Sequence, residues 1–174
     1  LRLVLVYKQL KIQLLTKISY NMKKFTQLLI ALLMSVLSWQ GMAQPGTTCG
    51  DPIVVNSLPF NDSGNTGDYG NNYGSTDVPA VAQNAVTTGT GSTSYLNGDD
   101  VVYAYTPSAN QIINVSTTND NDWIGLWAFT GCPFASTVGY HVAASGATRE
   151  ISELPVLAGT TYYFVISTWP TPQS

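Results

Sequence analysis

Positive charge is scarce in most of this chain. Only 10% of its 174 residues are charged, and six of its seven Lys and Arg residues lie within the first 24 positions. From residue 44 onward, Arg149 stands alone against ten acidic residues, which gives a formal charge of −9. A surface with this charge does not hold a phosphate backbone, so nucleic acid is excluded as a partner.

Long apolar runs and helical periodicity are also missing. No window after Gln44 combines a sustained helical period with capping residues, and the later chain is poor in Lys, Glu and Leu. Coiled coils and helical bundles are therefore excluded. The longest largely apolar run, residues 25–39, has 15 residues, fewer than the roughly 18 that a membrane-spanning helix needs.

This apolar run instead has the surroundings of a secretory signal peptide. Lys23 and Lys24 precede it, and Gly41 and Ala43 put small residues at the −3 and −1 positions before Gln44. We predict a signal peptide over residues 22–43, an uncleaved anchor being the alternative. Residues 1–21 are interpreted as a spurious upstream extension, and residues 44–174 as a secreted or cell-surface domain with no transmembrane span after cleavage.

Cysteine is limited to Cys49 and Cys132. Outside the cytoplasm, an even count favours a disulfide. Closing a loop of about 83 residues would stabilise the fold by roughly 4 to 5 kcal/mol in the chain-entropy model. The alternative is two separate buried thiols. A zinc site is not expected, because two thiolates and one His do not fill its four positions.

Short segments with a period of two, rich in β-branched and aromatic residues, fill the later chain. Turn clusters such as residues 107–110 and 119–122 separate them. The pattern predicts an all-β fold, an antiparallel β-sandwich of jelly-roll type. The predicted strands are residues 53–60, 101–106, 112–116, 123–129, 140–143, 149–154 and 161–168.

Two stretches depart from this strand pattern. Residues 61–97 are dominated by Gly, Asn, Ser and Thr, and we predict a long surface loop with one edge strand over residues 78–86. Near the other end, the apolar strand at residues 162–167 has no following partner. A sheet usually gives such a strand a neighbour, so we predict that the domain is truncated at its C-terminus.

Three segments, taken in order, carry a family resemblance: residues 98–107, 122–132 and 157–166. Together with the opening at Cys49 and the loop at residues 65–73, they resemble the pre-peptidase C-terminal domain of large secreted proteins of the Bacteroidetes type. The resemblance implies a β-sandwich that is appended to peptidases, other hydrolases or adhesins and is itself without catalysis. It also implies covalent linkage to further modules.

Catalytic residues are few. His141 is the one histidine, and no Gly-x-Ser-x-Gly motif accompanies it. The acid pairs Asp99 with Asp100 and Asp120 with Asp122 stand close together at turns, whereas glycoside hydrolysis needs carboxyl groups that face each other across a substrate. We predict no enzymatic activity and no required cofactor. The alternative is a small secreted hydrolase, or the accessory fragment of a secreted peptidase.

Calcium is the one metal that the residue types favour, because Ca²⁺ prefers oxygen ligands and the loops are rich in Asp and Asn. No twelve-residue calcium loop with a closing Glu is present. The alternative is that these residues form turns through their own side-chain hydrogen bonds. The candidate ligands are Asp62, Asn65, Asp68, Asp99, Asp100, Asp120 and Asp122.

Aromatic side chains are the candidate ligand contacts. Trp123 and Trp127 share one face of a predicted strand. If the opposite, aliphatic face is buried, the two indoles are exposed to a sugar or a partner protein; if not, they belong to the core. Tyr69 and Tyr73 lie on the polar loop and are predicted to serve recognition. The sequence thus predicts an accessory module for folding, surface attachment, or glycan or protein contact.

Overall fold

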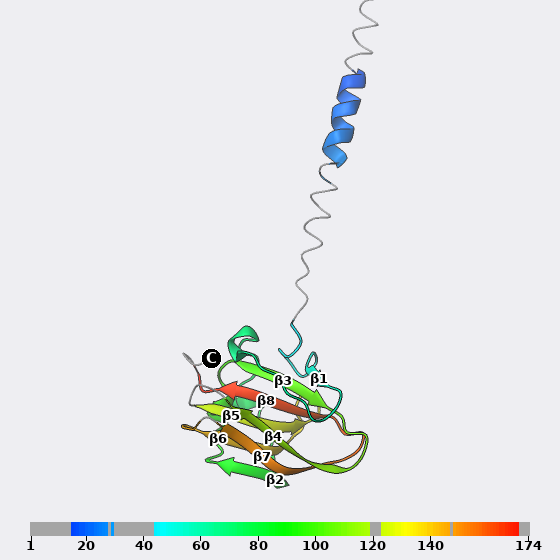
Figure 1. Ribbon diagram of the computed structural model, residues 1–174. Coiled ribbons are helices and arrows are strands. Elements are labelled where there is room, and N and C mark those ends of the chain that lie inside the picture. The colour runs from blue at the N-terminus through cyan, green and yellow to red at the C-terminus, as the bar shows by residue number, and fades with distance from the viewer. Residues whose placement is uncertain (1–14, 28, 30–43, 119–122, 147, 171–174) are drawn as a thin grey trace, which may run out of the picture. The chain divides into compact units, whose positions relative to one another are not determined.

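Strands make up most of the regular structure after residue 44 (Figure 1). The computed structural model describes residues 15–27, 29, 44–118, 123–146 and 148–170. The chain divides into two units, Leu1–Met42 and Ala43–Ser174. In the first, residues 15–27 form a helix, and no helix among the described residues has the length and apolarity to cross a membrane. Most of the predicted signal peptide lies outside the described residues.

The second unit contains eight strands within its described part, and three short 3-10 helices, η1 (Thr66–Asp68), η2 (Ser75–Asp77) and η3 (Thr93–Leu96). The prediction of an all-β sandwich is confirmed. The strands are β1 (Ile53–Val55), β2 (Val81–Gly89), β3 (Asp100–Tyr105), β4 (Gln111–Thr118), β5 (Ile124–Thr130), β6 (Ser136–Ala143), β7 (Thr148–Val156) and β8 (Tyr162–Thr168).

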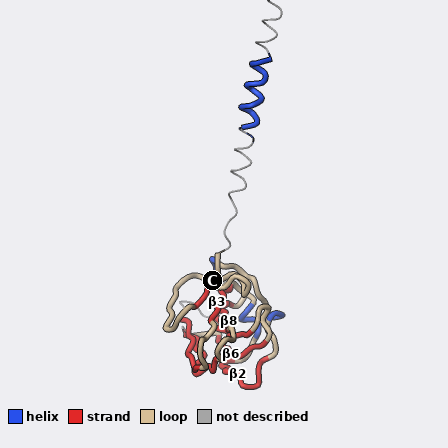
Figure 2. The backbone as a smooth tube through the Cα atoms, turned by 90° about the vertical axis from the view of Figure 1, so that its right-hand side faces the viewer, coloured by secondary structure: helices blue, strands red, loops and turns tan. Residues whose placement is uncertain are grey.

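The strands form two sheets of unequal size. The larger sheet has the order β1-β3-β8-β5-β6-β2, and the smaller sheet contains β4 and β7. Figure 2 labels β3, β8, β6 and β2 of the larger sheet in this order. The four central strands of the larger sheet are antiparallel, as predicted. Both edge strands differ, because β1 pairs in parallel with β3 and β2 in parallel with β6. Long crossovers rather than hairpins connect these pairs, and such connections permit parallel pairing.

The alternation of side chains along β5 buries both faces of the larger sheet. Leu126 and Ala128 point toward the smaller sheet, and Trp127 and Phe129 point the opposite way. The core between the sheets contains Val55, Tyr105, Ile113, Leu126, Ala128, Ile151, Leu154, Val156, Tyr162 and Phe164. The second core, on the outer face, contains Tyr95, Leu96, Val102, Trp127, Phe129, Val142 and Val165.

The long polar stretch has a structural role that its composition does not predict. It contains the predicted edge strand, β2. It also supplies Tyr95 and Leu96, which are buried against the outer face of the larger sheet. A few apolar residues among many polar ones are therefore enough to cover this face, and the stretch is more than a surface loop.

A disulfide joins Cys49 to Cys132, with the two Cα atoms 5.6 Å apart. The bond links the segment before β1 to the turn between β5 and β6. The predicted pairing is confirmed, and the alternative of two separate thiols is wrong.

Candidate functional site

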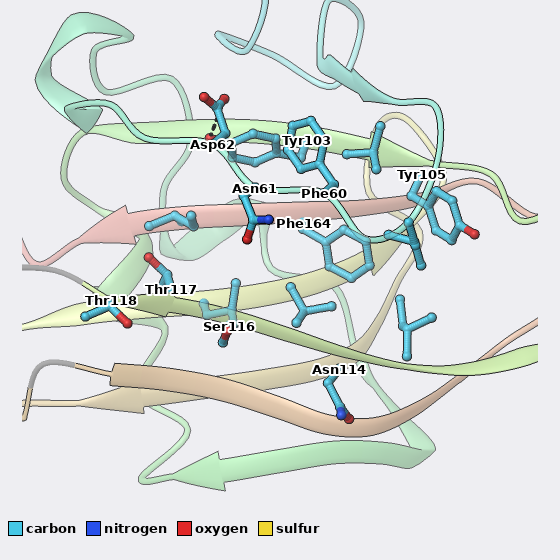
Figure 3. Close-up of a pocket in the computed structure, with 16 residues that line it drawn as sticks. Phe60, Asn61, Asp62, Tyr103, Tyr105, Asn114, Ser116, Thr117, Thr118 and Phe164 are labelled. Carbon is cyan, nitrogen blue, oxygen red and sulfur yellow. Dashed lines mark hydrogen bonds between the residues drawn. The ribbon is translucent and has the colours of Figure 1, made fainter.

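The smaller sheet covers only part of the larger one, and a groove opens on the uncovered side (Figure 3). β7 packs against β2, β5 and β6, whereas Ile113 of β4 and residues 58–62 pack against the part of the larger sheet formed by β1, β3 and β8. This β4 groove has a volume of about 530 Å³. Strands β3, β5 and β8 form its floor, and β4 and residues 58–62 form its walls.

The floor of the β4 groove is aromatic because of the alternation along two paired strands. Tyr103 and Tyr105 are two residues apart on β3 and therefore point to the same face. Phe164 of β8 is the direct partner of Tyr103, so its ring lies on that face too. Phe60, from the wall, packs edge-on against Tyr103 with ring centroids 6.0 Å apart.

Polar groups line the rim of the β4 groove. The hydroxyl of Tyr103 donates a hydrogen bond to Asp62 at 3.3 Å. Burial, and then the charge of Asp62, raise the pKa of Tyr103, so this phenol stays protonated and remains a donor. The amide of Gln111 donates to the hydroxyl of Tyr105, and the side chain of Asn61 extends from its wall over the floor (Figure 3). The site thus combines an apolar floor with neutral and acidic polar groups.

The two tryptophans predicted as ligand contacts have different positions. Trp127 is 1% exposed and stacks on Phe129, so its prediction as a ligand contact is wrong and the core alternative is correct. Trp123 is 39% exposed and lies against Tyr95 and Trp169. The two do not continue one strand face, because Trp123 has a φ of 66° and precedes β5.

The two predicted tyrosines pack onto the segment around the disulfide. The hydroxyl of Tyr73 accepts a hydrogen bond from the backbone amide of Cys49 at 2.6 Å, and its ring lies on Phe134 with centroids 4.7 Å apart. Tyr69 is half-buried, and its ring closely approaches Gly46. These contacts give both rings a packing role in the described structure.

The candidate calcium ligands are dispersed. Asp62 lines the β4 groove, Asn65 caps η1 by accepting from Gly67, and Asp68 is exposed. Asp99 is half-buried and Asp100 fully buried. Among the described residues, no three His, Cys, Asp or Glu side chains gather as metal ligands. Asp120 and Asp122 lie outside the described residues, and calcium binding stays a prediction.

Asp100 attaches the long polar stretch to the larger sheet. Its Oδ2 accepts hydrogen bonds from the backbone amides of Asn72 at 2.9 Å and Tyr73 at 3.1 Å. Burial raises the pKa of Asp100 from 3.8 to about 6, although the two amides favour the charged form. The native state therefore binds a proton more readily than the unfolded chain between about pH 4 and 6.

Asp100→Asn is expected to flatten the dependence of stability on pH. In the unmodified protein the Asp100 carboxyl lowers the free energy of unfolding as pH rises from about 4 through about 6, by roughly 3 kcal/mol in total. Urea denaturation at pH 4, 5, 6 and 7 measures this slope. Asp68→Asn, at an exposed carboxylate, is the control and should keep the slope. An unchanged slope in Asp100→Asn would show that another group titrates.

His141 lies half-buried on β6, and its Nδ1 accepts a hydrogen bond from the backbone N–H of Glu150 at 2.9 Å.

Comparisons with family models, with curated proteins and with solved structures give no match to this chain. Its function is therefore inferred from the positions of its own residues. Of the predicted site residues that the structure describes, only Asp62 lines the β4 groove. The sequence signal that was missed is the pair Tyr103 and Tyr105 on one strand face.

Proposed function

We propose that this chain is a non-catalytic accessory module of an exported protein, and that it binds a partner in the β4 groove. One observation carries the proposal: beside the smaller sheet, a groove of about 530 Å³ brings aromatic residues of the larger sheet together with polar groups on its rim. Concave sites that combine apolar and aromatic residues with a few polar groups are where proteins bind ligands.

Several features favour this function over hydrolysis. The Nδ1 atom of His141 is engaged with a backbone amide, and the Oδ2 atom of Asp100 accepts two such amides inside the domain. A disulfide across the domain is compatible with an extracellular location. The resemblance to pre-peptidase C-terminal domains supports an accessory role beside a peptidase, hydrolase or adhesin.

An NMR titration of the exported, isotopically labelled protein tests this function. We expect soluble oligosaccharides or extended peptides to shift the amide signals of Tyr103, Val115 and Ile166, which line the β4 groove. The signals of Trp127 and Val142, in the core of the outer face, serve as the internal control. Turnover of a peptidase or glycosidase substrate that His141→Ala or Asp100→Asn abolishes would contradict the proposal.

A further inference from the structure

Strand β4 has a free edge beside the β4 groove. Its register pairs it with β7 alone, and no other described strand pairs with it. A free strand edge carries a row of backbone N–H and C=O groups that are ready to pair with another chain. Six consecutive residues of β4, 113–118, line the groove, so the edge and the groove run side by side.

This edge lacks the features that usually protect an exposed strand. Charged side chains, proline and bulges prevent strands from pairing at an edge. β7, the other strand of the smaller sheet, carries Glu150, Glu153 and Pro155, and Glu153 has a φ of 55°. β4 reads QIINVSTT and contains neither a charged residue nor a proline. The unprotected strand of the smaller sheet is thus the one that borders the groove.

The floor of the groove fits the side chains of an added strand. Neighbouring strands lie about 4.8 Å apart and stacked sheets about 10 Å apart. A third strand beside β4 would therefore lie over β8, between β4 and residues 58–62, and direct every second side chain toward the floor. Phe164 and Tyr105 there are only 6% and 8% exposed, which leaves little ring surface for stacking a sugar. Apolar side chains of an added strand would instead contact Leu58 and Phe60 of the wall, which are 45% and 40% exposed.

We propose that the β4 groove takes an extended polypeptide of a partner, which pairs with the free edge of β4 and adds a third strand to the smaller sheet. This inference depends on the proposed function, that the groove binds a partner. The strand has apolar residues toward the floor and basic residues between them. The basic residues are favoured because Asp62 lies on the rim and the chain from residue 44 onward has a formal charge of −9.

The test uses a panel of synthetic peptides of about seven residues, the length that spans this part of β4. Each alternates an apolar residue with lysine or threonine. Every peptide is also made with N-methyl groups on alternate backbone amides, in two forms that block one strand edge or the other. We expect binding to slow hydrogen exchange of amides in residues 113–118 by more than tenfold. One N-methylated form should lose binding, and the other should retain it.

Substitutions at the rim test the choice of basic peptides. Asp62→Asn is expected to weaken binding of the lysine peptides about twofold to fivefold at low salt, as surface charge pairs do. Asp68→Asn, also exposed but outside the groove lining, should leave binding unchanged. Equal affinity of the lysine and threonine peptides would overturn the proposed preference for basic residues.

The remaining outcomes separate the inference from the proposed function. Groove shifts produced by an oligosaccharide, with none from any peptide, would overturn the added strand and keep the groove as a binding site. Protection of the β4 amides that rises with protein concentration, without peptide, would replace the partner by a second copy of this chain. Absence of groove shifts with every ligand would overturn the proposed function itself.

Discussion

Replacing Cys49 and Cys132 together by serine is expected to lower the free energy of unfolding by about 4 to 5 kcal/mol. The disulfide joins residues 83 positions apart, and its loss returns that closure entropy to the unfolded chain. The bond holds the segment before β1 onto the turn between β5 and β6. For a domain of this size the loss corresponds to a fall in Tm of about 10 to 20 °C.

Thermal and urea denaturation of the oxidised protein measure this effect. The unmodified protein in a reducing agent is the matched control, because it loses the same bond without a change of sequence. Its midpoint should fall to that of the double variant. If the double variant and the oxidised protein unfold at the same midpoint, the bond does not constrain the unfolded chain as the entropy model requires.

The pattern of side chains predicted the strands well where both their alternation and their turns are strong. Residues 101–106 and 161–168 were predicted as strands and form β3 and β8, offset by one residue at most at each end. These strands pair with each other through six residues, so local pattern and long-range pairing agree. The disulfide is consistent with this fold as well: it was predicted from the expected extracellular compartment and the even number of cysteines, and the fold brings Cys49 and Cys132 together.

The faces of the strand that contains the tryptophans were harder to predict. A period of two places Trp123 and Trp127 together only if the backbone between them is extended throughout. Trp123 has a φ of 66°, in the left-handed region, and the strand begins after it. The sequence contains no signal for this turn, because bulky residues rarely adopt such a φ.

The β4 groove was beyond prediction for a different reason. The groove exists because a sheet of six strands packs against a sheet of only two. The alternation of side chains along a strand does not indicate to which of the two sheets that strand belongs. Asp62 and Tyr103 meet across 41 positions of sequence. That approach depends on β1 pairing in parallel with β3, a connection that local pattern does not determine. The sequence therefore predicted that the residues of the aromatic floor form strands, but not that they line a binding site.

Arg149→Met is expected to destabilise the domain by about 3 kcal/mol or more. Arg149 is the one cation after residue 44, yet it is 1% exposed. Its guanidinium donates to the backbone carbonyls of Ile124 at 2.8 Å and Ala143 at 2.8 Å, and also to those of Gly146 and Thr148. Methionine fills similar volume but donates no hydrogen bond. Each buried carbonyl left without its donor costs about 1 to 3 kcal/mol.

Two further variants separate hydrogen bonding from charge at this position. Arg149→Lys keeps the positive charge, but its single ammonium lacks the planar fork that reaches carbonyls on both β5 and β6, so we expect a loss close to that of Arg149→Met. Glu150→Gln, at the exposed neighbouring residue, should change stability by less than about 0.5 kcal/mol. Full stability in Arg149→Lys would contradict this account, because it would mean that charge alone stabilises the junction of β5, β6 and β7.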